Sequence, residues 1–156
     1  MSRAFVSEAA EEARAALLVE RPVSTHTNFV TPRGLALIDA ELAALQSALA
    51  SGPADDSARS RLLRDLRYWQ TRRTSARVVE NRQTAPDEIV FGTLVGIRRG
   101  ATSSSFRIVG EDEADPAHAR LSWTSPLATA LIGARLHDVV DIGGGREPVT
   151  VETISP

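Results

Sequence analysis

The sequence has 156 residues, of which 42% are hydrophobic and 24% are charged, a balance typical of one or two small folded domains. It contains no cysteine and no lysine, and all 18 basic residues are arginine, which excludes disulfides, thiolate metal ligands, cysteine nucleophiles and lysine Schiff bases. No apolar run reaches the roughly 18 residues that a membrane span needs, and the N-terminus lacks the order of a secretory signal. We therefore expect a cytoplasmic protein that does not contact a membrane.

The net charge of −2 is unevenly distributed along the chain. Residues 1–30 carry −1, residues 31–83 carry +3 and residues 84–156 carry −4. The whole chain is therefore not a general polyanion binder, because only its middle part is basic.

Residues 1–30 are interpreted as an N-terminal arm or linker. Ser7 can cap a short helix, and three glutamates lie at the positive end of its dipole: Glu8, Glu11 and Glu12. Residues 21–28 show no hydrophobic period, so we read them as a linker, a mobile tail or an arm laid on the surface.

Residues 31–50 carry the pattern of a helix that packs against one partner helix. Thr31 is a good N-cap and Pro32 suits the first helical position. The apolar residues then recur at spacings of three and four, as in a coiled-coil seam: Leu35, Ile38, Leu42, Leu45 and Leu49. The 18 residues from 33 to 50 would extend about 27 Å.

A short turn at residues 51–54 contains Gly52 and Pro53, which end a helix. Asp55, Asp56 or Ser57 can then cap a second helix, whose seam consists of Leu62, Leu66, Trp69 and Ala76. A connection of about five residues makes the two helices antiparallel neighbours. We therefore predict an antiparallel coiled-coil hairpin over residues 31–80, with Asp55 and Asp56 near its tip.

The second helix is rich in arginine, and four of these residues could form a basic stripe: Arg59, Arg61, Arg64 and Arg67. One interpretation is a solvated outer face, with Arg61 and Asp65 as an i,i+4 pair. The other is a surface that faces nucleic acid or an acidic protein channel.

The hydrophobic period changes after a polar joint at residues 81–87. Alternating residues from Ile89 to Ile97 predict a strand, residues 98–102 a hairpin turn and residues 106–110 a returning strand. An acidic loop over residues 111–116 and a short strand at 120–123 follow. Ser125 and Pro126 then predict a helix start, and two last strands, 138–142 and 148–154, flank a glycine turn at 143–145. We predict an α+β domain over residues 85–156, with an antiparallel sheet and one helix.

Residues 106–115 and 125–133 resemble the C-terminal domain of the GreA/GreB transcript-cleavage factors, as do residues 90–92 and 138–140. Residues 67–79 and 31–34 are similar to the end and the start of that family's coiled coil. The resemblance covers about residues 30–156, is specific in the C-terminal part and looser in the helices, and leaves residues 1–30 outside.

The resemblance implies an FKBP-like domain that docks on RNA polymerase and a coiled coil that enters the polymerase secondary channel. On this basis the factor is not itself an enzyme, carries no cofactor of its own and contacts nascent RNA and DNA only indirectly, as a monomer. The implied polymerase-binding residues lie in the acidic loop and at the helix start: Asp112, Glu113, Asp115, Ser125, Pro126 and Leu127.

In the family, acidic residues at the coiled-coil tip help to hold the catalytic Mg²⁺ of the polymerase. This sequence departs from the family there, because the family's tip motif is missing and each helix is several turns shorter. Only Asp55 and Asp56 lie near the turn, and capping of the second helix is enough to explain them. We therefore expect a factor that occupies the channel and modulates elongation; the alternative is an active cleavage factor whose tip carboxylates reach the shared Mg²⁺.

Other functions have little support in the sequence. The three histidines are far apart, so we predict no metal site, and no nucleophile-elbow motif is present. A peptide-binding or prolyl isomerase module is a third reading, but such a cleft needs an aromatic lining, and this domain offers only Phe91, Phe106 and Trp123.

Overall fold

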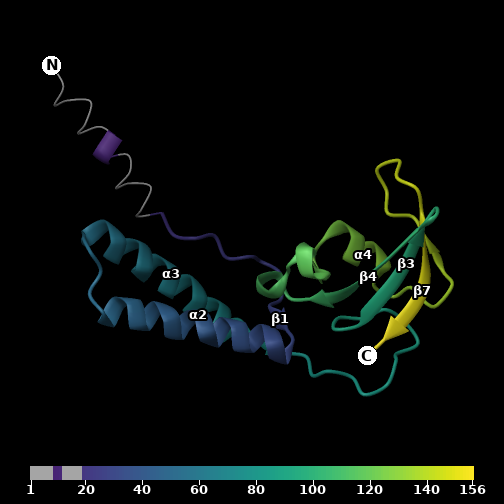
Figure 1. Ribbon diagram of the computed structural model, residues 1–156, viewed down its shortest axis with the longest axis horizontal. Helices are drawn as coiled ribbons and strands as arrows, with labels where there is room; N and C mark the ends of the chain where they lie inside the picture. Colours follow the sequence, from purple (N-terminus) through teal and green to yellow (C-terminus); the bar gives the residue numbers. More distant parts are fainter. Residues whose placement is uncertain (1–8, 12–18) are drawn as a thin grey trace. The chain divides into compact units, whose positions relative to one another are not determined.

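The structure is a computed structural model that describes residues 9–11 and 19–156. The predicted cap Ser7 and its neighbours Glu8 and Glu12 lie outside the described residues. Figure 1 shows the elements, which are in chain order β1 (Phe29–Val30), α2 (Pro32–Ala50), α3 (Asp56–Ser75), β2 (Arg77–Val78), β3 (Leu94–Arg99), β4 (Thr102–Val109), η1 (Glu111–Glu113), η2 (Pro116–His118), β5 (Arg120–Ser122), α4 (Pro126–Leu131), β6 (Val139–Val140) and β7 (Val149–Ser155).

The chain divides into two compact units. The first unit comprises Ile38–Ser75 and the N-terminal residues up to Thr25, and the second comprises His26–Leu37 and Ala76–Pro156. The first turns of α2 thus belong to the same unit as the sheet.

Two helices, α2 and α3, make up most of the first unit. The apolar residues of the predicted α2 seam within this unit are buried or half-buried, whereas most residues between them are exposed. Nε of Arg73 lies 2.5 Å from Oδ1 of Asp39, so an ion pair joins α3 to α2. Gly52, with φ of +82°, lies in the turn between the helices, where a left-handed conformation favours glycine.

The second helix is shorter than the sequence predicted. It ends at Ser75, and Ala76 therefore lies outside the helix. Residues 77–78 instead form β2, which pairs in parallel with β1. The N–H of Arg77 donates to the carbonyl of Asn28 at 2.8 Å, so strand pairing satisfies backbone groups that another helical turn would have used.

The five-stranded sheet of the second unit has the order β5-β4-β3-β7-β6. Neighbouring strands are antiparallel except β4 and β5, which run parallel. The expectation of an antiparallel sheet was therefore wrong at this edge, and the sheet is mixed. Parallel neighbours need a longer connection than a hairpin, and here the chain between β4 and β5 forms η1 and η2, with the left-handed residue Ala119 before β5.

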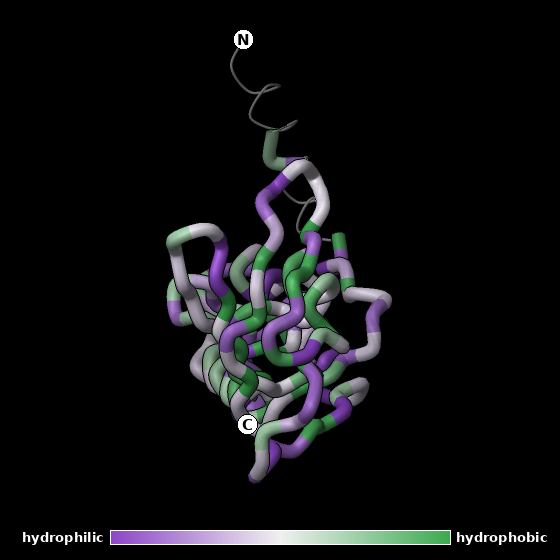
Figure 2. Tube along the Cα trace, turned by 90° about the vertical axis from the view of Figure 1, so that its right-hand side faces the viewer, coloured by the Kyte–Doolittle hydropathy of each residue, from purple (hydrophilic) through white to green (hydrophobic). Residues whose placement is uncertain are grey.

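The core of this unit lies between the sheet and α4. It consists of apolar residues from the strands, from α4 and from the segment before β3: Ile89, Val95, Ile97, Phe106, Ile108, Ala128, Leu131, Val149 and Val151. Figure 2 shows hydrophobic stretches interrupted by hydrophilic ones along the chain, as expected where one face of a strand is buried.

Two predicted strands are shorter than the alternation suggested. The first does not span residues 89–97, because Gly92 has φ of +91° and the N–H of Thr93 turns back to the carbonyl of Val90; only Leu94–Arg99 is strand. Ile89 is nevertheless fully buried. The strand expected at 138–142 is restricted to Val139–Val140.

Candidate functional site

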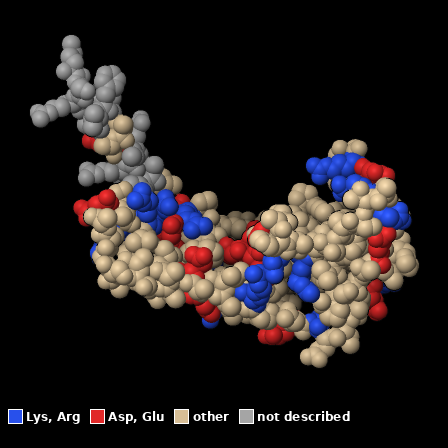
Figure 3. Space-filling model, viewed as in Figure 1, with Lys and Arg blue, Asp and Glu red and all other residues tan. Residues whose placement is uncertain are grey.

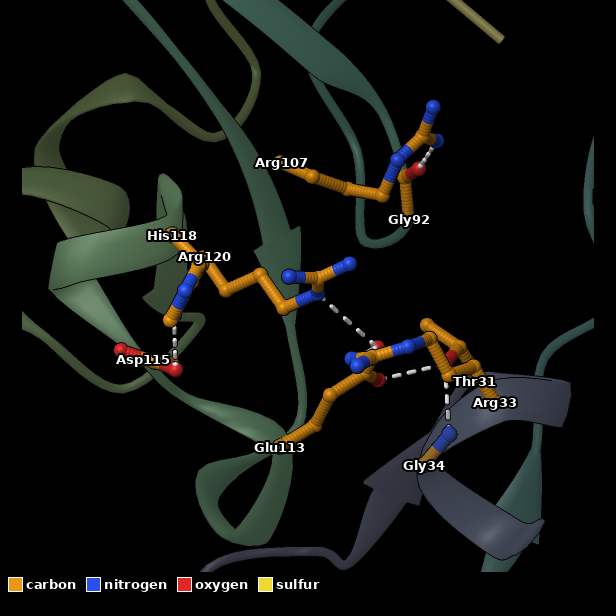
Figure 4. A network of polar contacts seen from close by, with 9 residues as sticks. All are labelled: Thr31, Arg33, Gly34, Gly92, Arg107, Glu113, Asp115, His118 and Arg120. Carbon is orange, nitrogen blue, oxygen red and sulfur yellow. Dashed lines mark hydrogen bonds and ion pairs between the residues drawn. The ribbon is translucent and has the colours of Figure 1, made fainter. Parts of the chain in front are cut away.

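A buried carboxylate connects the first turn of α2 to η1 within the second unit (Figure 4). The side chain of Glu113 is 2% exposed. Its Oε2 accepts a hydrogen bond of 2.5 Å from the hydroxyl of Thr31, which itself accepts the N–H of Gly34 at 2.9 Å. Thr31 thus caps α2, as the sequence predicted, and also binds Glu113.

Two arginines approach the other oxygen of the same carboxylate. Nη1 of Arg33 lies 3.4 Å and Nε of Arg120 lies 3.7 Å from Oε1 of Glu113. Both separations exceed the roughly 2.7–2.9 Å of a strong charge-assisted hydrogen bond. Glu113 therefore attracts both guanidinium groups but forms a close ion pair with neither of them. Because it is buried and already bound, Glu113 is a structural residue and not an exposed docking residue.

Two glycines allow the close approach of backbones at this junction. A Cβ on Gly34 would lie 2.9 Å from Oε2 of Glu113, and a Cβ on Gly110 would lie 2.5 Å from the carbonyl oxygen of Phe29. Neither position tolerates a larger residue without a shift of its neighbours. The sequence contained these glycines, but nothing in it revealed which residues they approach.

An aromatic group flanks the same segment. The ring of Phe29 packs against those of Phe91 and Trp123, with centroid distances of 5.8 and 5.3 Å, and the ring of His26 lies 5.9 Å from Trp123. Residues 26–33 are thus held to the rest of the second unit by aromatic packing and by the Glu113 network.

The remaining predicted residues of the acidic loop are more accessible than Glu113. Asp115 and Asp112 are partly exposed. Nδ1 of His118 lies 2.6 Å from Oδ2 of Asp115, and this hydrogen bond holds the pKa of Asp115 below its usual value.

The predicted start of the last helix is present. The side chain of Ser125 accepts the N–H of Ala128 at 3.3 Å, and Pro126 occupies the first position of α4. Pro126 is exposed and Leu127 half-buried. The hydroxyl of Ser125 is therefore occupied by the helix, and the exposed part of this surface is mainly Pro126.

Asp55 and Asp56 lie at the turn between α2 and α3, and both are exposed. Oδ1 of Asp55 accepts the N–H of Ala58 at 2.7 Å, which is an N-cap interaction. Asp56 is the first residue of α3. The capping role is thus present, and it leaves the charge of both residues at the surface.

The basic stripe of α3 is partly compensated. Arg67 donates two hydrogen bonds to Glu20, at 2.9 and 2.5 Å, which hold the pKa of Glu20 low and raise that of Arg67. Arg64 contacts Asp65 at 3.2 Å, so the predicted Arg61–Asp65 pair is replaced by an Arg64–Asp65 pair. Arg59 and Arg61 are exposed. Acidic and basic side chains are interspersed on the face shown in Figure 3.

The N-terminal segment before residue 26 also contacts α3 within the first unit. The guanidinium of Arg21 lies 3.8 Å from the ring centroid of Tyr68 and 5.7 Å from that of Trp69, and it pairs with Asp65 at 3.5 Å. No periodic pattern in the sequence indicated this contact, because it depends on single residues.

The part of the chain that the structure describes contains no group of three or more metal-ligating side chains. Within the same residues, no helix combines the length and the hydropathy that crossing a bilayer requires. The structure instead presents a pair of helices with a charged turn, and a mixed-sheet domain with acidic and proline residues at its surface. These features define a two-part protein whose accessible groups suit binding.

Comparison with known proteins finds similarity in the C-terminal part of the chain. Residues 83–156 match the family model described as transcription elongation factor, GreA/GreB, C-terminal. GreB of Neisseria meningitidis serogroup A is 38% identical over 95 residues, which cover 58% of this chain and 58% of that protein. GreA of Syntrophotalea carbinolica is 46% identical over 69 residues, 43% of this chain and 44% of that protein.

Residues 83–156 therefore match the GreA/GreB C-terminal domain, and the resemblance predicted for this part of the sequence is confirmed. The chain spans about half the length of the curated relatives it matches. The crystal structure of GreA factor homolog 1 of Thermus thermophilus aligns with 84% of this chain and 100% of its own, at 19% identity and a TM-score of 0.39.

Proposed function

We propose that this protein is a transcription elongation regulator that binds RNA polymerase through an FKBP-like C-terminal domain and inserts α2 and α3, as an antiparallel coiled coil, into the secondary channel. The observation that carries this proposal is the GreA/GreB match over residues 83–156. The factor acts as a monomer in the cytoplasm, is not itself an enzyme, and modulates elongation by occupying the channel.

The accessible groups of the second unit support a docking role. Asp112 and Asp115 are partly exposed and Pro126 is exposed, so acidic side chains and an apolar ring lie at the surface, where a partner with a basic, partly apolar surface could contact them. Glu113 contributes by holding η1 in place and not by direct contact.

The charges of the helix pair support entry into a channel that contains nucleic acid. Arg59 and Arg61 are exposed on α3, and guanidinium groups bind phosphate oxygens. The factor would not recruit RNA or DNA by itself. The polymerase would hold both nucleic acids, and the helices would meet them only within the elongation complex.

Co-purification with core RNA polymerase tests this proposal. We expect the full chain to bind, and the double variant Asp112→Asn/Asp115→Asn to bind about tenfold more weakly or worse, because it removes charged contacts. The matched control is Glu80→Gln/Glu88→Gln, which removes two acidic side chains from exposed positions outside the acidic loop. Equal binding by the acidic-loop variant and the wild type would contradict the proposed docking surface.

A second candidate function rests on the exposed carboxylates of Asp55 and Asp56. Carboxylate oxygens suit Mg²⁺, and these two would complete the coordination of the polymerase's own metal during cleavage of backtracked RNA. A stalled, backtracked complex should then release short RNA when the protein is added, and Asp55→Asn/Asp56→Asn should abolish the release. An unchanged transcript at saturating protein would exclude active cleavage while leaving channel occupancy intact.

A further inference from the structure

A pocket of about 330 Å³ opens beside the Glu113 network in the second unit. Its lining consists of four arginines, three other polar residues and a proline: Arg33, Arg82, Arg107, Arg120, Thr31, Asn81, Glu113 and Pro156. The arginines come from four separate segments, namely the first turn of α2, the chain after β2, strand β4 and strand β5. Figure 3 shows basic side chains gathered around a hollow on this face.

Two of these arginines are paired across the sheet edge. Arg107 and Arg120 are direct partners in the parallel β4–β5 ladder, so their side chains leave the same face of the sheet. Like charges in directly opposite positions destabilise a sheet. This arrangement is favourable only where negative charge is nearby.

The protein supplies little of that negative charge itself. Glu113 contacts Arg33 and Arg120 through a single oxygen at 3.4 and 3.7 Å. Arg107 donates to the carbonyl of Gly92 at 2.6 Å (Figure 4) and to the backbone oxygen of Pro156 at 3.1 Å. These bonds orient the guanidinium, and Arg107 forms no ion pair with an Asp or Glu side chain of the described residues.

Arg82 adds a fourth positive charge to the pocket. Its side chain is exposed and makes no hydrogen bond or ion pair with the described residues. The four guanidinium groups therefore carry more positive charge than Glu113 and a C-terminal carboxylate at Pro156 could balance together.

We propose that this pocket binds the phosphate groups of a small polyphosphate ligand, of the size of pyrophosphate or of the phosphate chain of a nucleotide. Guanidinium groups bind phosphate oxygens in a bidentate manner, and Arg33, Arg82, Arg107 and Arg120 surround one volume from several sides. The volume is at the lower end of the range for small-molecule sites. Because seven of its eight lining residues are polar or charged and four of them are arginines, the ligand is a compact anion and not an apolar molecule.

The phosphate groups neutralise Arg107 and Arg82 first, since neither forms an ion pair with an Asp or Glu side chain of the described residues. Glu113 remains behind Arg33 and Arg120 and holds both guanidinium groups toward the pocket. This binding is independent of RNA polymerase, so its failure would not affect the proposed function.

Isothermal titration calorimetry of the full chain at low salt tests the proposal, with separate titrations of sodium pyrophosphate, a nucleoside triphosphate and an oligonucleotide without terminal phosphates. We expect the first two to bind and Arg82→Ala to weaken them about fivefold, the upper range for one exposed ion pair. Arg33→Ala/Arg82→Ala should weaken them further. Amide NMR shifts should move at Gly34, Glu113 and Arg120.

Matched controls separate this pocket from general attraction of anions. Arg146→Ala removes one exposed arginine, and Arg59→Ala/Arg61→Ala removes two exposed arginines of α3; both should bind pyrophosphate as the wild type does. Equal losses in the controls would overturn the proposal. So would the absence of binding at millimolar pyrophosphate, or pocket-dependent binding of the oligonucleotide alone.

Discussion

The hydroxyl of Thr31 donates a hydrogen bond of 2.5 Å to Oε2 of Glu113, although the two residues lie 82 positions apart in the sequence. This bond joins the N-cap of α2 to the loop that follows β4. The N-terminus of α2 and the position of η1 therefore both depend on the buried carboxylate of Glu113.

Glu113→Ala should lower the free energy of unfolding by about 1–3 kcal/mol, because it removes a buried hydrogen bond and leaves Thr31 and Arg33 without their acceptor. Urea unfolding followed by circular dichroism measures this change. Glu80→Ala is the matched control, an exposed glutamate whose removal should change stability by less than about 0.5 kcal/mol. Similar values for both variants would contradict the role of Glu113.

Gly34→Ala should destabilise the protein although alanine is the better helix former. The propensity gain is about 1 kcal/mol, but the new Cβ would lie 2.9 Å from Oε2 of Glu113, and that oxygen cannot retreat without breaking its bond to Thr31. In a Glu113→Ala background the clash is absent, so Gly34→Ala should become neutral or stabilising there. A double-mutant cycle in urea measures the coupling, and a coupling near zero would rule the contact out.

The location of Glu113 illustrates what the sequence could not provide. Four acidic residues within residues 111–115 look like a solvated loop, and no periodicity distinguishes the buried member from the exposed ones. The burial follows from the arrival of Thr31 and Arg33 from a distant segment, which is tertiary information. The same holds for Arg107 and Arg120, which become neighbours only because β5 runs parallel to β4.

Local signals were more successful than pairing signals. The structure begins α2 at Pro32, caps α3 with Asp55 and begins α4 at Pro126, as the capping residues predicted. The direction of β5 was mispredicted because alternation identifies a strand but not its partner. The antiparallel coiled coil, the tip role of Asp55 and Asp56 and the polymerase-binding residues stay predictions.

His118→Ala should raise the pKa of Asp115, because the hydrogen bond from His118 is the main cause of its lowering. An NMR titration of the Asp115 carboxyl carbon measures this pKa in the wild type and in the His118→Ala variant. The pKa of Asp115 is lower in the folded state than in the unfolded state. The ionised carboxylate of Asp115 therefore stabilises the fold above the ordinary pKa of 3.8, and this stabilisation is lost as the pH falls through the lowered pKa. Identical titration curves would show that His118 does not bind Asp115 in solution.

Arg67→Ala should raise the pKa of Glu20, whose lowering is caused first by the hydrogen bond from Arg67. The glutamate carboxyl carbon reports this directly in an NMR titration. Arg61→Ala, which removes an exposed arginine from the same helix, should leave the curve of Glu20 unchanged. If both variants shift it equally, the effect is the general field of α3 and not a specific contact of the N-terminal segment.

Substitutions of Asp55 can separate helix capping from metal chemistry at the turn. Asp55→Ala should destabilise the protein by about 1 kcal/mol, because it removes the acceptor for the N–H of Ala58. Asp55→Asn keeps a capping oxygen and should restore most of this loss while removing the charge. Thermal unfolding measures stability, and transcript release from a backtracked polymerase complex measures cleavage. If channel occupancy is the function, Asp55→Asn should behave as the wild type in both assays; a stable Asp55→Asn protein that loses transcript release would instead identify an active cleavage factor.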